Sequence, residues 1–464
     1  MKAIDVVIMA AGKGTRMKSR VPKVLQQLAG KPLLQHVLQT AQALQARSSV
    51  VITGHGAAEV EASIRLAATP GQTLHFVRQE PQLGTGHAVQ QAVPVLADDG
   101  LVLVLSGDVP LTEVATLQAL IAQCGGDKLA LLTIDFADPT GYGRIVRTGE
   151  RVQAIVEQKD ASESQRAITE VYSGIMAVPA RLLKNWLARL ETNNAQGEYY
   201  LTDIVKFAVS DGVPVLAHRI SDVLQVAGIN SPVQLAELER AFQRRQANAL
   251  MELGVRLADP ARFDLRGQLD CAQDVEIDVN CIFQGRVSLG EGVKIGANCM
   301  ISNASIAAGA VIHPFSHIEG AATKGRVEVG AGALVGPFAR LRPGARLGEQ
   351  VHIGNFVEVK NATLAPGAKA NHLAYLGDSV VGERVNFGAG SITANYDGVN
   401  KQQTVIEADV HIGSNCVLVA PVTIGAGGTI GGGSTITRDT APGVLTVARA
   451  KQVSLSSWKR PLKK

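Results

Sequence analysis

The sequence predicts two architectures in one chain, a mostly parallel, doubly wound (Rossmann-like) α/β sheet followed by a left-handed parallel β-helix. Before about residue 260, short apolar runs alternate with segments of helical spacing, which is typical of a parallel sheet covered by helices. After it, an apolar residue recurs every six positions, as in Ile277, Phe283, Leu289, Ile295 and Ile301. A period of six fits neither a helix nor a simple strand, and it is the hexapeptide signature of a β-helix.

The first half of the chain has apolar runs of strand length separated by helical segments. Strands are predicted at residues 4–11, 49–54, 74–78, 101–105 and 128–136, and helices at residues 32–46, 86–96 and 111–124. This alternation places helices on both faces of the sheet. Ligands of such sheets bind beyond the carboxyl ends of the strands.

The second half begins with a long helix, predicted at residues 232–253 from its Leu, Ala, Glu, Gln and Arg content. Three hexads make one triangular coil, so the repeats that follow predict roughly ten coils and, at about 4.8 Å each, a length of about 50 Å. Residues 395–401 interrupt the repeat, and such insertions form loops on one face, often the binding face. We expect a domain at 1–230, a linker helix at 231–254, the β-helix at 255–440 and a tail at 441–464.

The composition indicates a soluble globular protein with small anionic substrates. The 464 residues carry a formal net charge of +4, which is too small for general nucleic-acid binding. Five scattered cysteines form no CxxC pair, so neither a disulfide framework nor a zinc site is expected. No apolar run approaches the roughly 18 residues that span a bilayer. We therefore expect a cytoplasmic protein without a membrane span.

Glycine turns and charged residues follow the predicted strands of the first half. Residues 10–17 read Ala-Ala-Gly-Lys-Gly-Thr-Arg-Met, where the glycines let backbone N–H groups approach a polyphosphate and the two basic residues add positive charge. Lys23 follows, residues 82–88 form a second glycine turn, and Asp108 follows the strand at 101–105. Singly, such a loop can be only a turn, and such an Asp can be only a helix N-cap. The ordered set indicates a nucleotide site.

A polar cluster interrupts the regular hexads of the β-helix. Its members are Arg342, Lys360, residues 371–378, Asn386 and residues 395–396. Polar residues cost stability on a regular solenoid unless they serve a ligand. His372 lies among basic and amide groups, which suits an anionic substrate and proton transfer. The alternative is a β-helix that only holds subunits together.

These motifs resemble those of known enzymes. GKGTRM with PK, LGTGHA, GDVP and DPTGYGR are similar to the motifs of sugar-nucleotide pyrophosphorylases. Together with NHLAYLGD and ANYDG, nearly the whole chain resembles the bacterial bifunctional N-acetylglucosamine-1-phosphate uridyltransferases and glucosamine-1-phosphate acetyltransferases. The resemblance implies acetyl transfer from acetyl-CoA to glucosamine-1-phosphate, then uridyl transfer from UTP with release of pyrophosphate. The product, UDP-N-acetylglucosamine, supplies peptidoglycan and lipopolysaccharide. Mg²⁺ and a homotrimer joined through the β-helix are also implied.

The resemblance assigns roles in the first half of the chain. Lys23 and Arg16 are implied catalytic residues near the phosphates, and Asp108 and Asn230 are implied magnesium ligands. The implied substrate-binding residues are Ala10, Ala11, Gly12, Lys13, Lys23, Gln79, Gly84, Thr85, Ser106, Gly107, Asp108, Gly143, Glu157, Tyr172 and Asn230. Tyr172 stands where the family usually has an Asn that contacts the sugar, which leaves sugar recognition open.

In the β-helix, the resemblance implies that His372 is the general base for acetyl transfer. Glucosamine-1-phosphate would be bound by Arg342, Lys360, Tyr375 and Asn386, and acetyl-CoA by Ala389, Asn395, Tyr396, Ser414, Gly432 and Arg449. Two rival functions are a pyrophosphorylase for another sugar with a regulatory β-helix, and a non-catalytic assembly subunit. The first does not need His372 and its polar neighbours, and the second predicts the loss of Asp108, Lys23 or His372.

Overall fold

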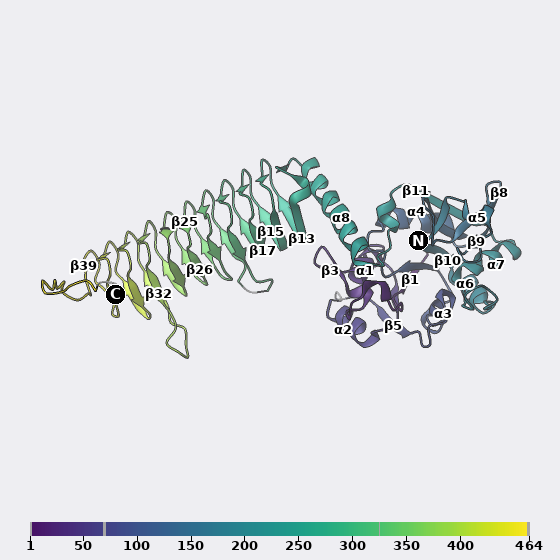
Figure 1. Ribbon diagram of the computed structural model, residues 1–464, viewed down its shortest axis with the longest axis horizontal. Helices are drawn as coiled ribbons and strands as arrows, with labels where there is room; N and C mark the ends of the chain where they lie inside the picture. Colours follow the sequence, from purple (N-terminus) through teal and green to yellow (C-terminus); the bar gives the residue numbers. More distant parts are fainter. Residues whose placement is uncertain (1, 68–70, 324, 462–464) are drawn as a thin grey trace. The chain divides into compact units, whose positions relative to one another are not determined.

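The computed structural model describes residues 2–67, 71–323 and 325–461. They form two compact units, which divide between Ala241 and Phe242. Figure 1 shows a helix-covered sheet in the first unit and stacked coils of short strands in the second. The α/β sheet and the parallel β-helix predicted from the sequence are thus confirmed. Within the described ranges, no helix combines the length and hydrophobicity that crossing a bilayer requires.

The sheet of the first unit has the order β11-β7-β10-β6-β1-β4-β5, and β10 is antiparallel to both of its neighbours. Its strands are β1 (Ile4–Met9), β4 (Ser48–Thr53), β5 (Leu74–Arg78), β6 (Leu101–Ser106), β7 (Leu129–Asp135), β10 (Glu170–Pro179) and β11 (Val215–Ile220), with the hairpin β8 (Arg144–Thr148) and β9 (Arg151–Val156) paired to β10, and a separate short pair, β2 (Gln27–Leu28) and β3 (Lys31–Pro32). All five predicted strands are present. Strands β8 to β11 follow residue 136, beyond which no strand of the first unit was predicted.

Helices cover both faces of this sheet. They are α1 (Leu33–Ala43), α2 (Ala57–Ala67), α3 (Thr85–Gln90), α4 (Val114–Cys124), α5 (Glu163–Arg166), α6 (Ala180–Leu187) and α7 (Ile204–Ser210). Val6 and Ile8 of β1 join one buried cluster and Val7 joins the other, which contains Trp186 of α6. The predicted helix at 86–96 was wrong in its second half. It ends at Gln90, and a 3₁₀ turn with Pro94 follows, because proline cannot donate a helical hydrogen bond.

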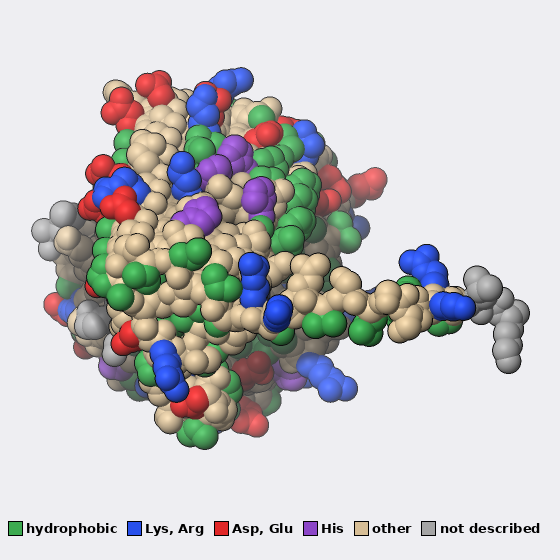
Figure 2. Space-filling model, turned by 90° about the vertical axis from the view of Figure 1, so that its left-hand side faces the viewer, with side chains coloured by type: hydrophobic (Ala, Val, Ile, Leu, Met, Phe, Trp, Pro, Cys, Tyr) green, Lys and Arg blue, Asp and Glu red, His purple; other side chains and the backbone are tan. Residues whose placement is uncertain are grey.

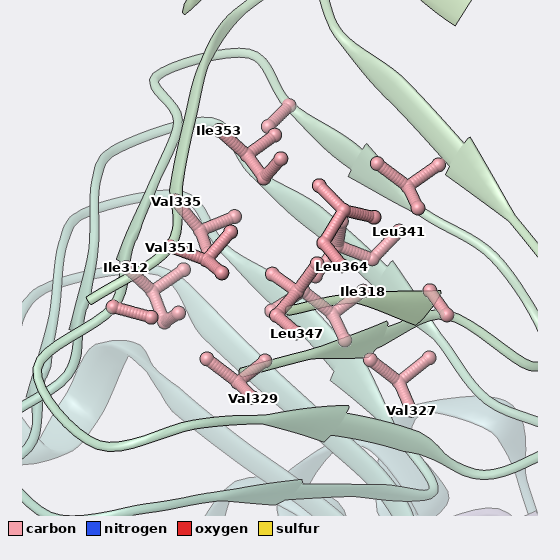
Figure 3. Close-up of a cluster of buried hydrophobic side chains, with 14 of the residues drawn as sticks. Ile312, Ile318, Val327, Val329, Val335, Leu341, Leu347, Val351, Ile353 and Leu364 are labelled. Atoms are coloured by element: carbon pink, nitrogen blue, oxygen red, sulfur yellow. The ribbon is translucent and has the colours of Figure 1, made fainter. Parts of the chain in front are cut away.

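The second unit is a β-helix of parallel sheets. One sheet has eleven strands from β12 (Arg256–Leu257) to β39 (Leu445–Thr446), and the other has 17 strands from β13 (Phe263–Cys271) to β38 (Thr435–Ile436). Hexad residues pair from coil to coil, as Ile312 does with Val335 and Val335 with Ile353, and all three are fully buried. Figure 3 shows these side chains together with Leu341 and Leu347 in one apolar core. The apolar residues that recur at every sixth position of the sequence therefore form the inward-facing columns of the β-helix.

Helix α8 (Pro232–Glu252) crosses the division between the units, and its second half belongs to the β-helix. Ala247 and Leu250 are part of the β-helix core. Gln243 is 1% exposed, and it accepts the N–H of Leu265 at 2.7 Å and donates to the carbonyl of the same residue at 3.0 Å. The helix thus caps the first coil, whose backbone groups have no preceding coil to pair with.

Candidate functional site

A cavity of about 470 Å³ opens where β1, β5 and β6 end. It is lined by Met9, Ala10, Ala11, Gly12, Lys13, Lys23, Val24, Gln79, Gln82, Gly84, Thr85, Ala88, Ser106, Asp108 and Glu198. Most of the residues predicted for the nucleotide site are in this set. Arg16, Gly107 and Asn230 are not, and Arg16 is exposed on a 3₁₀ turn, Thr15–Met17, just after the loop.

The loop after β1 contains a tight glycine turn beside this cavity. Gly14 adopts a left-handed conformation with φ of 59°, and a Cβ placed on it would lie 2.6 Å from the Cβ of Lys23. Apart from Gly12 itself and its two chain neighbours, no heavy atom of the described residues lies within 4 Å of the position that a Cβ on Gly12 would take, so there is open space beside its backbone. Gln82 Nε2 donates to the carbonyl of Ala11 at 2.6 Å and ties this loop to the second glycine turn. Gln82 was not among the predicted site residues.

The second glycine turn is built around Gln79, which is 5% exposed and donates to the Gly84 carbonyl at 2.8 Å. Gly84 has φ of 110°, and a Cβ there would lie 2.7 Å from the carbonyl oxygen of Tyr199. The hydroxyl of Thr85 accepts the N–H of Leu201 at 3.0 Å. These contacts fix the second glycine turn, which Gln82 joins to the loop after β1.

The two predicted metal ligands lie together. The Nζ of Lys23 is 2.5 Å from Asp108 Oδ2 and 3.1 Å from Asn230 Oδ1, so one cation bridges the carboxylate and the amide oxygen. The Ile229 N–H donates to the Asp108 carbonyl at 3.1 Å and joins their two loops. Oxygen donors of this kind fit Mg²⁺, which keeps several waters or phosphate oxygens as further ligands. Among the described residues there is no cluster of three or more His, Cys, Asp or Glu side chains suited to a metal.

Gly143, Glu157 and Tyr172 form a separate group that does not line this cavity. The Tyr172 N–H donates to the Gly143 carbonyl at 2.9 Å, and Thr202 donates to Glu157 at 2.9 Å. Burial raises the pKa of Glu157, and burial together with the Glu157 charge raises that of Tyr172. The Tyr172 hydroxyl is buried and has no hydrogen-bond partner within the described ranges. Leaving such groups inside the protein costs free energy, which favours a polar ligand beside them.

Cations gather on the β-helix around β26 (Glu358–Lys360). Arg342, just after β23 (Arg340–Leu341), donates to Glu358 at 2.7 Å, which raises the pKa of the guanidinium. Lys401 of the inserted loop lies against Lys360. This contact is the main cause that lowers the pKa of the Lys360 ammonium, and burial and the charge of Arg342 lower it further. Lys401 was not among the predicted site residues, although it is the last residue of the predicted insertion at 395–401. Three cations brought this close favour an anion at the same place.

The inserted loop is held by Asp378. This carboxylate accepts hydrogen bonds from Asn361, at 2.5 Å, and from Asn395, which precedes the exposed Tyr396. Tyr375 begins β29 (Tyr375–Gly377) and pairs in register with Glu358. Strand pairing of successive coils therefore brings Arg342, Lys360 and Tyr375 together, and the inserted loop adds Lys401.

His372 ends β28 (Lys369–His372) and is exposed. The remaining predicted acetyl-CoA residues continue from it along the β-helix. Backbone hydrogen bonds at the same turn join successive coils through the carbonyls of His372, Ala389 and Ser414, and Arg449 donates to the Gly432 carbonyl at 2.7 Å. Figure 2 shows histidine side chains gathered on one face of the chain. Asn386 contacts His411 at 3.1 Å on the neighbouring strands.

Comparisons with known proteins cover both units. Residues 6–201 match the MobA-like NTP transferase domain, and residues 403–438 match the bacterial transferase hexapeptide repeats. The chain is 76% identical, over 99% of its own length and 100% of the relative, to the bifunctional protein GlmU of Albidiferax ferrireducens. It is 72% identical to the protein of the same name from Paracidovorax citrulli, over 100% and 99% of the two chains. A UDP-glucose pyrophosphorylase from Acinetobacter baumanii is similar at 19% identity, with a TM-score of 0.42 over 54% of this chain and 99% of the other.

Proposed function

We infer the function from one premise, which is that the chain belongs to the family of the bifunctional protein GlmU. It is a bifunctional enzyme of UDP-N-acetylglucosamine synthesis. The β-helix transfers an acetyl group from acetyl-CoA to glucosamine-1-phosphate. The first unit then joins the product to UTP and releases pyrophosphate. The observation that supports this best is that one chain holds two separate polar sites, each built for an anionic substrate.

Uridyl transfer joins two anions, so positioning and charge neutralisation supply most of the catalysis. Asp108 and Asn230 would hold the divalent metal that the family requires, which we propose is Mg²⁺, and its charge would neutralise the phosphates of UTP. Backbone N–H groups of the loop at 10–14 cradle the polyphosphate, and Lys13 and Lys23 reach it from the cavity wall. Glu157 and Tyr172 orient the sugar through its hydroxyl and amide groups.

Acetyl transfer needs the neutral amine, whose nitrogen gains positive charge as it bonds to the thioester carbon. We assign His372 as the general base that takes a proton from this nitrogen, while the C–S bond breaks and CoA leaves. The phosphate of glucosamine-1-phosphate would be held by Arg342, Lys360 and Lys401, and its charge would relieve the repulsion between the two lysines. The carbonyl column from His372 to Gly432 would carry acetyl-CoA along the coils.

We propose that the hexapeptide unit assembles as a homotrimer. An apolar ladder of Phe315, Phe338, Phe356 and Leu373 is exposed along one edge, and its phenyl rings stack with centroids 5.0 and 5.4 Å apart. A partner that covers this ladder would lie beside His372. We expect Phe338→Glu to weaken assembly in sedimentation velocity, whereas Leu66→Glu, at a 92% exposed position of α2, should not. Unchanged assembly of the first variant would contradict the proposed interface.

We assign the reaction to the cytoplasm, where UTP and acetyl-CoA are made.

The test is a product analysis with the purified full chain. With glucosamine-1-phosphate, acetyl-CoA, UTP and Mg²⁺, mass spectrometry should find UDP-N-acetylglucosamine, CoA and pyrophosphate. Omitting acetyl-CoA should stop the synthesis, and N-acetylglucosamine-1-phosphate should restore it. Efficient use of glucose-1-phosphate without any CoA release would favour a pyrophosphorylase for another sugar, and no product at all would favour an assembly subunit.

A further inference from the structure

The ammonium group of Lys23 occupies the position between the two proposed metal ligands. It lies 2.5 Å from Asp108 Oδ2 and 3.1 Å from Asn230 Oδ1, and the side chains of Lys23 and Asp108 are only 14% and 19% exposed. A magnesium ion would lie about 2.1 Å from the same oxygens. Two cations cannot share this space, because the contact and the repulsion between them would both be unfavourable. The lysine therefore has to leave before the metal can bind.

The surrounding structure allows the head of Lys23 to move while its stem stays in place. Lys23 begins the 3₁₀ turn Lys23–Leu25, and the backbone of Gly14 packs against its Cβ. Beyond that point the side chain has three further carbons and lines the same cavity as Gly12 and Lys13. A polyphosphate in that cavity would offer the ammonium a new anionic partner. The stem thus links the phosphate loop to the metal ligands.

We propose that Lys23 and the divalent metal compete for Asp108 and Asn230, so that the enzyme takes up its metal together with the nucleotide. Without nucleotide, Lys23 neutralises Asp108 and keeps free metal from binding. With nucleotide, the phosphates draw the ammonium away and open the two oxygens. This inference rests on the proposed uridyl transfer, and it adds an order of binding to that reaction.

The experiment measures Mn²⁺ binding to the full chain without nucleotide, by the electron paramagnetic resonance signal of free Mn²⁺. Lys23→Met should bind Mn²⁺ at least about tenfold more tightly than the wild type, because the competing charge is gone. Lys23→Arg should stay as weak as the wild type, since it keeps the positive charge. Lys13→Met removes an equal charge from the same cavity without touching Asp108, and it should change binding by less than about twofold. Asp108→Asn in the Lys23→Met background should abolish the gain.

Equal Mn²⁺ affinity in the wild type and Lys23→Met would overturn the proposal, as would an equal gain in Lys13→Met. Thermal unfolding of each variant, followed by circular dichroism, reports that the first unit, which contains Lys23, is folded. Because Mn²⁺ binding needs no turnover, this outcome is independent of the product analysis. A wild-type enzyme that makes UDP-N-acetylglucosamine while Lys23→Met gains no metal affinity would reject the competition and keep the function.

Discussion

Replacing Lys401 with methionine removes one of the two ammonium groups that lie against each other beside β26. If these groups hold the phosphate of glucosamine-1-phosphate, the substrate loses one charge-assisted hydrogen bond, worth about 1.5 kcal/mol at its lower limit. We use this limit because Lys401 is exposed. Since 1.4 kcal/mol corresponds to a factor of ten, KM for glucosamine-1-phosphate should rise about tenfold. The turnover number should change little, because the phosphate is bound equally before and during the reaction.

Lys401→Met should make the protein more stable while it weakens substrate binding. Without substrate, the protein loses the repulsion between Lys401 and Lys360, and for partly exposed charges the free energy of unfolding should rise by about 0.5 kcal/mol. The assay follows CoA release against glucosamine-1-phosphate concentration, with uridyl transfer and the unfolding midpoint measured on the same preparation. Lys294→Met is the matched control. Lys294 forms an ion pair with Glu276 on coils far from Lys401, so this substitution should leave KM unchanged. An unaltered KM for Lys401→Met, or a loss of stability with it, would refute the reasoning.

The two activities should separate by mutation. Asp108→Ala should abolish uridyl transfer and spare acetylation, and His372→Ala should cut acetylation by roughly 10²–10⁴ while uridyl transfer continues; loss of both activities in one folded variant would contradict the two-site assignment. Glu157→Gln should stabilise the protein near pH 7 in thermal unfolding scans, because burial raises the pKa of this carboxyl and makes its charged form unfavourable in the folded state. That gain should fade as pH falls below about 4, where the carboxyl is protonated in both the folded and unfolded states, and a gain independent of pH would contradict the cause. A β-helix fragment that keeps all of α8 should melt higher by circular dichroism than one starting at Leu253, which lacks Gln243 and its two bonds to the first coil.

Local patterns account for the parts of the fold that were predicted correctly. Period-six apolar residues identify the β-helix column because each coil repeats the same inward position, as Val335 and Ile353 show. The five predicted strands of the first unit were equally clear, since Val6 to Ile8 and Leu101 to Leu105 are continuous apolar runs in a sheet buried on both faces. Pro94 was visible too, but its effect on the preceding helix was overlooked.

Contacts between distant segments account for what was missed. Gln243 reads as one more residue of a polar helix, and only its docking on Leu265 makes it a cap of the β-helix. Lys401 belongs to an inserted loop, and its meeting with Lys360 depends on how Asn395 binds Asp378. Neither contact leaves a periodic signal in the sequence.

The sequence by itself determined the two architectures, the residues at the strand ends and the family, because strand and coil periodicity are local and the motifs are short. Only the tertiary structure decided that the ammonium of Lys23 lies between Asp108 and Asn230. Along the chain, Asp108 is 85 positions from Lys23 and Asn230 is 207 positions from it. Their contact depends on how the sheet brings the ends of its strands to one edge, and on the free energy of pairing a half-buried charge, neither of which is carried by any single stretch of sequence.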